Sequence, residues 1–278
     1  MGVSIPFRRG VVEIIYLENI SKRYKDNELY SSVNEHFEKG DSVAFTGHNG
    51  CGKSTMLKII GRLIMPTSGK VVYSDRLNVR YVTEKFEPVN CTARDFLMHM
   101  GRIGNSTDKY LKERIEKLSK DFFVSDYLDV NLKNMSKGTL QKIVVIQALL
   151  EVPDVLLLDE PFSGQDKESQ NVFINKIKQI KDSGTTIFMS CHEERLINAL
   201  SDKIYTIENC CVKRRDKINS DSYIILFKGG TDTDIYNKCV KTDEFYRLRV
   251  SEKQVNSTIV ELIKHGCEVR GLRNEKYN

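Results

Sequence analysis

The hydrophobic residues of the first 210 positions follow two patterns. Short apolar runs rich in β-branched side chains predict strands, and apolar residues spaced three or four apart predict helices. The run from Val155 to Leu158 is continuously apolar, which is typical of a strand buried on both faces of a sheet. Strands are expected at residues 12–20, 43–46, 70–73, 78–83, 155–158 and 185–190, and helices at 56–60 and about 134–150. The alternation of these strands and helices along the chain predicts an α/β fold.

The pattern changes between Glu84 and about Val145. Apolar residues there recur at helical spacing, and Gly101 and Gly104 mark a break between helices. We therefore expect a helical subdomain, at about residues 85–145, inserted into the α/β core. Residues 1–210 would form one domain.

Weaker signals follow Cys211. Residues 222–228 and 246–250 predict strands, Gly229 and Gly230 a turn between elements, and residues 255–264 an amphipathic helix. Residues 211–278 are expected to form a small α+β extension whose role the sequence does not indicate.

Composition narrows the class of protein. The chain is 40% hydrophobic and 29% charged, and its apolar runs fall short of the roughly 18 residues that a membrane-spanning helix needs. Seven cysteines are scattered without C-x-x-C spacing, which favours reduced thiols over a metal site. The net charge of +5 lies mostly after residue 210, where 14 Lys and Arg face 10 Asp and Glu. We expect a protein that does not span a membrane and does not bind nucleic acid.

One glycine-rich stretch carries the strongest chemical signal. It follows the predicted strand 43–46, precedes the helix 56–60, and fits the phosphate-binding motif G-x-x-x-x-G-K-[ST]. Its residues are Gly47, His48, Asn49, Gly50, Cys51, Gly52, Lys53, Ser54 and Thr55. Backbone NH groups and the helix N-terminus would hold phosphates, Lys53 would reach the β- and γ-phosphates, and the Ser54 hydroxyl would bind Mg²⁺.

Polar side chains follow two of the buried strands. Asp159 and Glu160 come directly after the strand at 155–158, and His192 lies just beyond the strand at 185–190. The carboxyl ends of parallel strands are where α/β folds place ligand chemistry, so these residues should be neighbours. Two adjacent carboxylates repel, and a nearby cation is therefore expected.

These motifs, in this order, resemble the ATP-binding cassette (ABC) family, in particular the ATPase subunit of a transporter. The resemblance covers about residues 12–210: residues 47–55 resemble Walker A, residues 155–160 Walker B, residues 163–166 the D-loop, and residues 135–139 the signature sequence. It implies a P-loop NTPase core of ABC type with ATP and Mg²⁺ as ligands.

The resemblance also implies a role for each catalytic position. Ser54 and Asp159 would bind Mg²⁺, Lys53 would neutralise phosphate charge, Glu160 would act as general base, and His192 would contact the γ-phosphate. Hydrolysis would then depend on positioning and electrostatics.

Further positions and partners follow from the same resemblance. Tyr24 would stack on adenine, and Ser136 and Gly138 would complete the site of a second subunit, so a homodimer or a paired relative is implied. The chain would power a separate transmembrane permease. It would itself lie in the cytoplasm, held by that permease on the inner face of the membrane.

Two departures from the family pattern leave alternatives open. Glu84 stands where Gln is usual, and would face Mg²⁺ or water and take part in catalysis. Lys137 stands where Gly is common in the signature. The short insert favours export of a drug, peptide or similar compound. A regulatory or sensing ATPase with slow turnover is one alternative, and an ABC protein acting on ribosomes or DNA is another.

Overall fold

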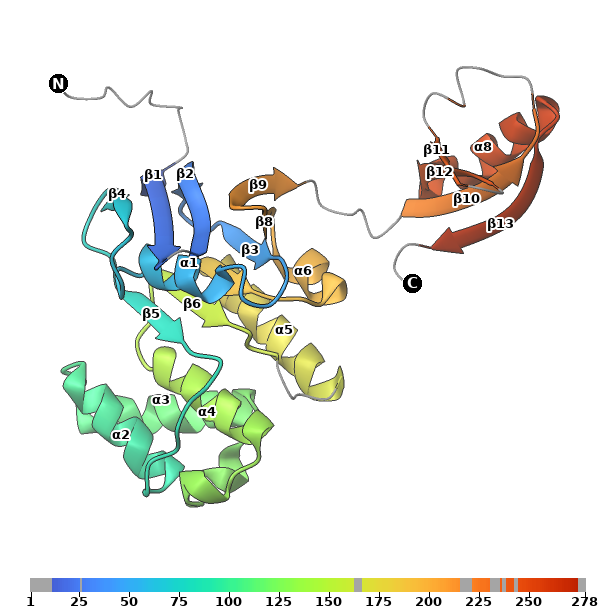
Figure 1. Ribbon diagram of the computed structural model, residues 1–278. Coiled ribbons are helices and arrows are strands. Elements are labelled where there is room, and N and C mark those ends of the chain that lie inside the picture. Colours follow the sequence, from blue (N-terminus) through green and yellow to red (C-terminus); the bar gives the residue numbers. More distant parts are fainter. Residues whose placement is uncertain are drawn as a thin grey trace. The chain divides into compact units, whose positions relative to one another are not determined.

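The computed structural model describes residues 12–25, 27–162, 167–215, 222–230, 236, 239–242 and 245–274. The chain divides into two compact units, Met1–Asp216 and Lys217–Asn278. Figure 1 shows the elements of each unit. Among the described helices, none combines the length and hydrophobicity that crossing a bilayer requires.

A six-stranded sheet organises the first unit. Its strand order is β5-β6-β7-β3-β8-β9, and the strands are parallel except for β9, which is antiparallel to β8. The strands are β3 (Ser42–Thr46), β5 (Val79–Val82), β6 (Val155–Asp159), β7 (Thr186–Ser190), β8 (Lys203–Glu208) and β9 (Cys211–Arg215). Because β7 lies between β3 and β6, three functional loops emerge from adjacent strands at one sheet edge.

The central strands are buried on both faces, as the apolar run in β6 predicts. Val155 and Leu157 belong to one hydrophobic core, and Leu156 and Leu158 belong to another on the opposite face. Successive side chains of a strand point to opposite faces, so a strand between two cores needs apolar residues at every position.

A second sheet and the first helix enclose one of these cores. β1 (Glu13–Tyr24) lies between β2 (Asn27–Glu38) and β4 (Ser68–Tyr73) in an antiparallel sheet. Helix α1 (Lys53–Ile60) contributes Met56, Leu57, Ile59 and Ile60 to the same core. Packing against both sheets fixes the start of α1, which is where the phosphate-binding loop ends.

The helical insert is present. It contains α2 (Ala93–Ile103), α3 (Asp108–Asp121), two short 3₁₀ turns, η1 (Ser125–Tyr127) and η2 (Leu132–Asn134), and α4 (Lys137–Ala148). Thr92, Thr107 and Ser136 cap the three helices, each by accepting a hydrogen bond from a first-turn NH group. Helices α5 (Lys167–Asp182) and α6 (Glu194–Leu200) return to the α/β core.

The second unit is a four-stranded antiparallel sheet with one helix. Its strand order is β11-β12-β10-β13, with β10 (Ser222–Lys228), β11 (Val240–Lys241), β12 (Tyr246–Ser251) and β13 (Glu268–Asn274). Helix α8 (Glu252–Lys264) shares a small core with the sheet. The strands and helix expected here are present, whereas β13 was not predicted. Strand β9 pairs with β8, so residues 211–215 belong to the first unit.

Candidate active site

The phosphate-binding loop has a backbone that depends on glycine. Gly47, Gly50 and Gly52 have φ angles of +139°, +83° and +110°. A Cβ at Gly47 would lie 2.6 Å from the carbonyl oxygen of Ile207, so a side chain there has no room. A Cβ at Gly50 would meet nothing within 4 Å, which leaves open space over the loop. No side chain caps the N-terminus of α1, whose first NH groups are therefore open to an anion.

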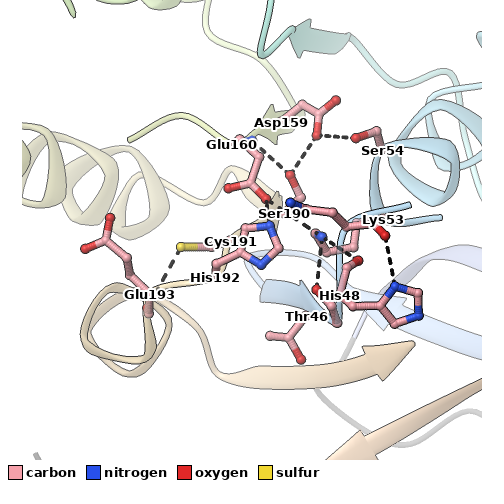
Figure 2. A network of polar contacts seen from close by, with 12 residues as sticks. Thr46, His48, Lys53, Ser54, Asp159, Glu160, Ser190, Cys191, His192 and Glu193 are labelled. Atoms are coloured by element: carbon pink, nitrogen blue, oxygen red, sulfur yellow. Dashed lines mark hydrogen bonds and ion pairs between the residues drawn. The ribbon is translucent and has the colours of Figure 1, made fainter. Parts of the chain in front are cut away.

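Lys53 is folded back over this loop. Its side chain is 7% exposed, and Nζ donates hydrogen bonds to the carbonyl oxygens of Gly47 at 3.1 Å and His48 at 3.3 Å. Nζ also lies 4.0 Å from Oε1 of Glu160 (Figure 2). The loop thus holds a cation at the centre of the site.

Asp159 lies at the carboxyl end of β6 and is almost fully buried. Its Oδ1 accepts hydrogen bonds from Ser54 Oγ at 2.8 Å and Ser190 Oγ at 2.7 Å, and its Oδ2 accepts one from Tyr81 at 2.7 Å. These donors are neutral hydroxyls, so a cation would balance the carboxylate. Ser54 and Asp159 supply the hard oxygen ligands that Mg²⁺ prefers, and this donor set fits the ion.

The backbone of Glu160 is held in an unusual conformation. Its φ of +45° lies in the left-handed region, and its NH donates to Ser190 Oγ at 2.8 Å. Ser190 therefore joins Asp159 and Glu160 through one hydroxyl. Oε1 of Glu160 is buried and lies 2.8 Å from His192 Nε2, and within the described structure no hydrogen bond to this oxygen is found. Figure 2 shows both side chains directed toward Lys53.

The electrostatics of Glu160 differ from those of a surface carboxylate. Burial raises its pKa to about 7; Lys53 opposes this rise, while the carboxylates of Asp159, Glu84 and Glu193 add to it. Near neutral pH the side chain is therefore close to its titration midpoint, which suits a general base.

His192 follows β7 and has a side chain that is 44% exposed. Burial and the nearby Lys53 lower its pKa, and Glu84 partly offsets them. At neutral pH the imidazole is therefore uncharged, with one ring nitrogen able to donate and the other able to accept. This ring completes one wall of the cavity.

These side chains surround a cavity of about 460 Å³. It is lined by Asn49, Gly50, Gly52, Lys53, Ser54, Thr55, Glu84, Glu160 and His192. The structure thus brings together residues that lie far apart in the sequence. Glu84 lies on the cavity wall, beyond the end of β5.

Other predicted positions lie outside the cavity lining. Tyr24 is 50% exposed, at the end of β1, with Lys22 Nζ 4.7 Å from its ring centroid. Ser136 caps α4 and bonds to Thr139, and Gly138 lies in the first turn of that helix. The predicted D-loop, residues 163–166, lies outside the described residues.

Comparison with known proteins decides the family. An ABC transporter family model matches residues 30–163. The Bacillus subtilis (strain 168) protein described as ABC transporter ATP-binding protein NatA is 32% identical over 223 residues, which cover 74% of this chain and 91% of that protein. The chain belongs to the ABC transporter ATPase family.

Other members of the ABC family are similar over comparable lengths. The Vibrio vulnificus (strain YJ016) protein described as zinc import ATP-binding protein ZnuC is 30% identical over 218 residues, covering 77% of this chain and 82% of that protein. The dimeric post-hydrolysis structure of an ATP-binding cassette bound to ADP and Pi has a TM-score of 0.67 and 21% identity, covering 74% of this chain and 99% of that one. This second likeness shows the fold.

Two residues of this ABC site were not singled out from the sequence. Ser190 joins the two acidic residues, and Tyr81 donates to Asp159. Ser190 is the last residue of the predicted strand at 185–190, which the structure places next to β6. Its position at the end of that strand is the feature of the sequence that could have identified it. The position of Tyr81 depends on how β5 pairs with β6, where it lies opposite Leu157.

Proposed function

We propose that this ABC ATPase hydrolyses ATP as one of two cassettes and thereby drives a separate membrane permease. The observation that carries the proposal is the cavity in which Lys53, Glu160 and His192 converge beside the Ser54–Asp159 pair. Cation, hydroxyl, carboxylate and imidazole together supply what phosphoryl transfer needs.

We assign phosphate binding to the loop and to Lys53. The open NH groups at the start of α1 would hold phosphate oxygens, and Nζ would exchange its bonds to Gly47 and His48 for bonds to the β- and γ-phosphates. Ser54 and Asp159 would hold Mg²⁺. Glu84, on the wall of the same cavity, would face the ion or a water bound to it. When bound, Mg²⁺ neutralises charge on the phosphates.

We assign the general base to Glu160. Its Oε1 accepts no hydrogen bond within the described structure, so it is available to take a proton from an attacking water. Ser190 fixes the adjacent backbone, and His192 lies close enough to contact the γ-phosphate and to orient the same water. Removal of the carboxylate should therefore abolish hydrolysis and leave nucleotide binding intact.

A second cassette would complete the site. Ser136 and Gly138 lie at the exposed start of α4, a helix N-terminus suited to a phosphate, yet they do not line the cavity of their own chain. Their placement supports a role at the partner's nucleotide. Tyr24 would provide an adenine contact, because half of its surface remains exposed.

Two observations favour opposite directions of transport. The short helical insert favours export of a drug, peptide or similar compound, whereas one similar protein is described as a zinc import protein. A slowly hydrolysing regulatory subunit is the second candidate, since Glu84 adds a negative charge beside Glu160. We place the chain in the cytoplasm, held to the membrane by its permease.

Purification from membranes tests the transport proposal. The tagged full-length chain should co-purify with a multi-spanning protein, and ATP turnover should rise when that protein is present. The Glu160→Gln variant should retain both the permease and bound ATP while losing turnover. Recovery with ribosomes or DNA alone would refute the transport proposal, and brisk turnover without the permease would refute the regulatory alternative.

A further inference from the structure

Hydroxyl groups hold both oxygens of the Asp159 carboxylate. Ser54 and Ser190 donate to Oδ1 at 2.8 and 2.7 Å. Within the part of the chain that the structure describes, Oδ2 has one hydrogen-bond donor, the hydroxyl of Tyr81, at 2.7 Å. The terminal torsion of an aspartate is broad, so the orientation of the carboxylate is set by the groups that bond to its two oxygens. Tyr81 supplies the contact that the two serines do not.

The strand register explains why a tyrosine reaches this oxygen. Tyr81, in β5, lies opposite Leu157 of β6, two residues before Asp159. Side chains two apart on a strand point to the same face, so Leu157 and Asp159 share one face of the sheet. Two residues of strand span about 6.6 Å. A tyrosine side chain bridges that length, whereas the side chain of a serine or threonine is too short to do so.

The ring of Tyr81 is anchored in the core between the sheet and α1. Leu157 is fully buried in this core, and Tyr81 packs against the core as a partly buried residue. Helix α1, which carries Ser54, contributes Met56 and Leu57 to the same core. A side chain whose rotamer is locked by packing holds its polar atom in one place. Tyr81 is therefore a rigid donor whose direction is determined by the core.

Tyr81 and Ser190 contact Asp159 in different ways. Ser190 also accepts a hydrogen bond from the NH group of Glu160 at 2.8 Å, so a change at Ser190 disturbs both acidic residues. A phenol hydroxyl has one proton to donate, and that of Tyr81 goes to Asp159. A change at Tyr81 should therefore act on Asp159 and leave the proposed base in place.

We propose that Tyr81 is a positioning residue for the Mg²⁺ ion that Ser54 and Asp159 would hold. Mg²⁺ demands near-ideal octahedral geometry, so the orientation of a carboxylate ligand affects how tightly the ion binds. By holding Oδ2, Tyr81 keeps the carboxylate beside the Ser54 hydroxyl and raises the affinity of the site for the ion. The inference rests on the proposed function, because phosphoryl transfer at this site is what requires the ion.

Tyr81→Phe tests the proposal, because it removes the hydroxyl and leaves the ring in the core. Calorimetry should show that the variant binds ADP in EDTA as tightly as the parent does, since the phosphate-binding loop is unchanged. The free Mg²⁺ concentration that gives half of the Mg²⁺-dependent gain in ADP affinity should rise roughly 10- to 100-fold. ATP hydrolysis should show the same increase in its Mg²⁺ requirement, and saturating Mg²⁺ should restore most of the parent's rate.

Tyr205→Phe is the matched control. Tyr205, in β8, lies in the same core, and its hydroxyl also donates to a carboxylate, Oε2 of Glu35, at 3.0 Å. Glu35 belongs to β2 and is not part of the cavity lining. The control variant loses a tyrosine–carboxylate bond of the same kind and should keep the parent's Mg²⁺ requirement.

The dependence on Mg²⁺ separates a positioning role from a structural one. A structural role alone would weaken ADP binding with and without the ion. An unchanged Mg²⁺ requirement in Tyr81→Phe, an equal increase in both variants, or weaker binding of ADP to Tyr81→Phe in EDTA would overturn the proposal. If the parent's hydrolysis needs Mg²⁺ and rises with the permease, the transport proposal stands even when Tyr81→Phe behaves like the parent. Hydrolysis by the parent without any divalent cation would overturn the role of Tyr81 and the proposed mechanism together.

Discussion

Replacement of Glu160 by Gln should stabilise the nucleotide-free protein in a pH-dependent way. Burial raises the pKa of Glu160 from its ordinary value of 4.5 to about 7. Below about pH 4.5 the carboxyl is protonated in both folded and unfolded chains, and its full contribution to stability is present. As the pH rises through 7, the folded chain must hold a charge that its surroundings disfavour, and stability is lost.

The size of the effect follows from the pKa. A tenfold change in proton affinity corresponds to about 1.4 kcal/mol, so a rise from 4.5 to about 7 corresponds to roughly 3 kcal/mol. The glutamine cannot ionise and escapes this penalty. The stability gained by Glu160→Gln should therefore be larger at pH 8 than at pH 5 by about 2–3 kcal/mol.

Urea unfolding of the metal-free and nucleotide-free protein measures this difference. The second unit is identical in parent and variant, so the difference between them belongs to the first unit. Glu113→Gln, which removes an exposed carboxylate from α3, is the control and should change stability little at either pH. If the Glu160→Gln difference were the same at both pH values, the assignment of a raised pKa to Glu160 would be wrong.

Four further outcomes are expected. The rate of ATP hydrolysis at saturating ATP should rise between pH 6 and 8, because Glu160 must lose its proton to act as base; a flat profile of phosphate release would argue against this role. Ser190→Ala should destabilise the protein by about 1–3 kcal/mol and lower kcat more than ATP affinity, with Ser190→Thr as the conservative control. Gly47→Ala should abolish nucleotide binding, measured by calorimetry, because the added Cβ would contact a backbone oxygen. Gly50→Ala has room for its methyl group and should therefore bind nucleotide more tightly than Gly47→Ala does. Mixing inactive Lys53→Ala and Ser136→Ala chains should restore part of the activity, because one site of the mixed dimer is intact; no restoration in a proven mixed dimer would show that Ser136 does not act across subunits.

The central sheet was predictable because its strands have extreme sequences. Val155–Leu158 is apolar at every position, and a run of this kind is typical of a strand that is buried on both faces of a sheet. Strand β2 gave no comparable signal. Its buried residues Leu29, Tyr30, Val33 and Phe37 do not alternate, since register shifts interrupt the pairing of β1 with β2. Strand β13 is polar at most positions, and only pairing with β10 identifies it.

The residue types of the site were predictable, but its connections were not. Motif spacing placed Lys53 in the loop between a strand and a helix, and Asp159, Glu160 and His192 at or just beyond the ends of two other strands; the structure brings all four together. The bond from Ser190 to both acidic residues depends on parallel pairing that sets Ser190 opposite Asp159, a register that the sequence does not reveal. Likewise, the left-handed backbone of Glu160 follows from its neighbours rather than from its own preference.

The electrostatics of Glu160 offer a reason why two cassettes would be needed. In a lone chain the carboxyl is close to half protonated at pH 7, and bound phosphates would add negative charge that favours the proton further. A partner's α4 would bring a helix N-terminus, and with it a partial positive charge, toward the same phosphates. That charge would favour loss of the proton. Closure of the proposed dimer would therefore complete the phosphate contacts and activate the base in one step, so a lone chain should bind ATP and hydrolyse it slowly.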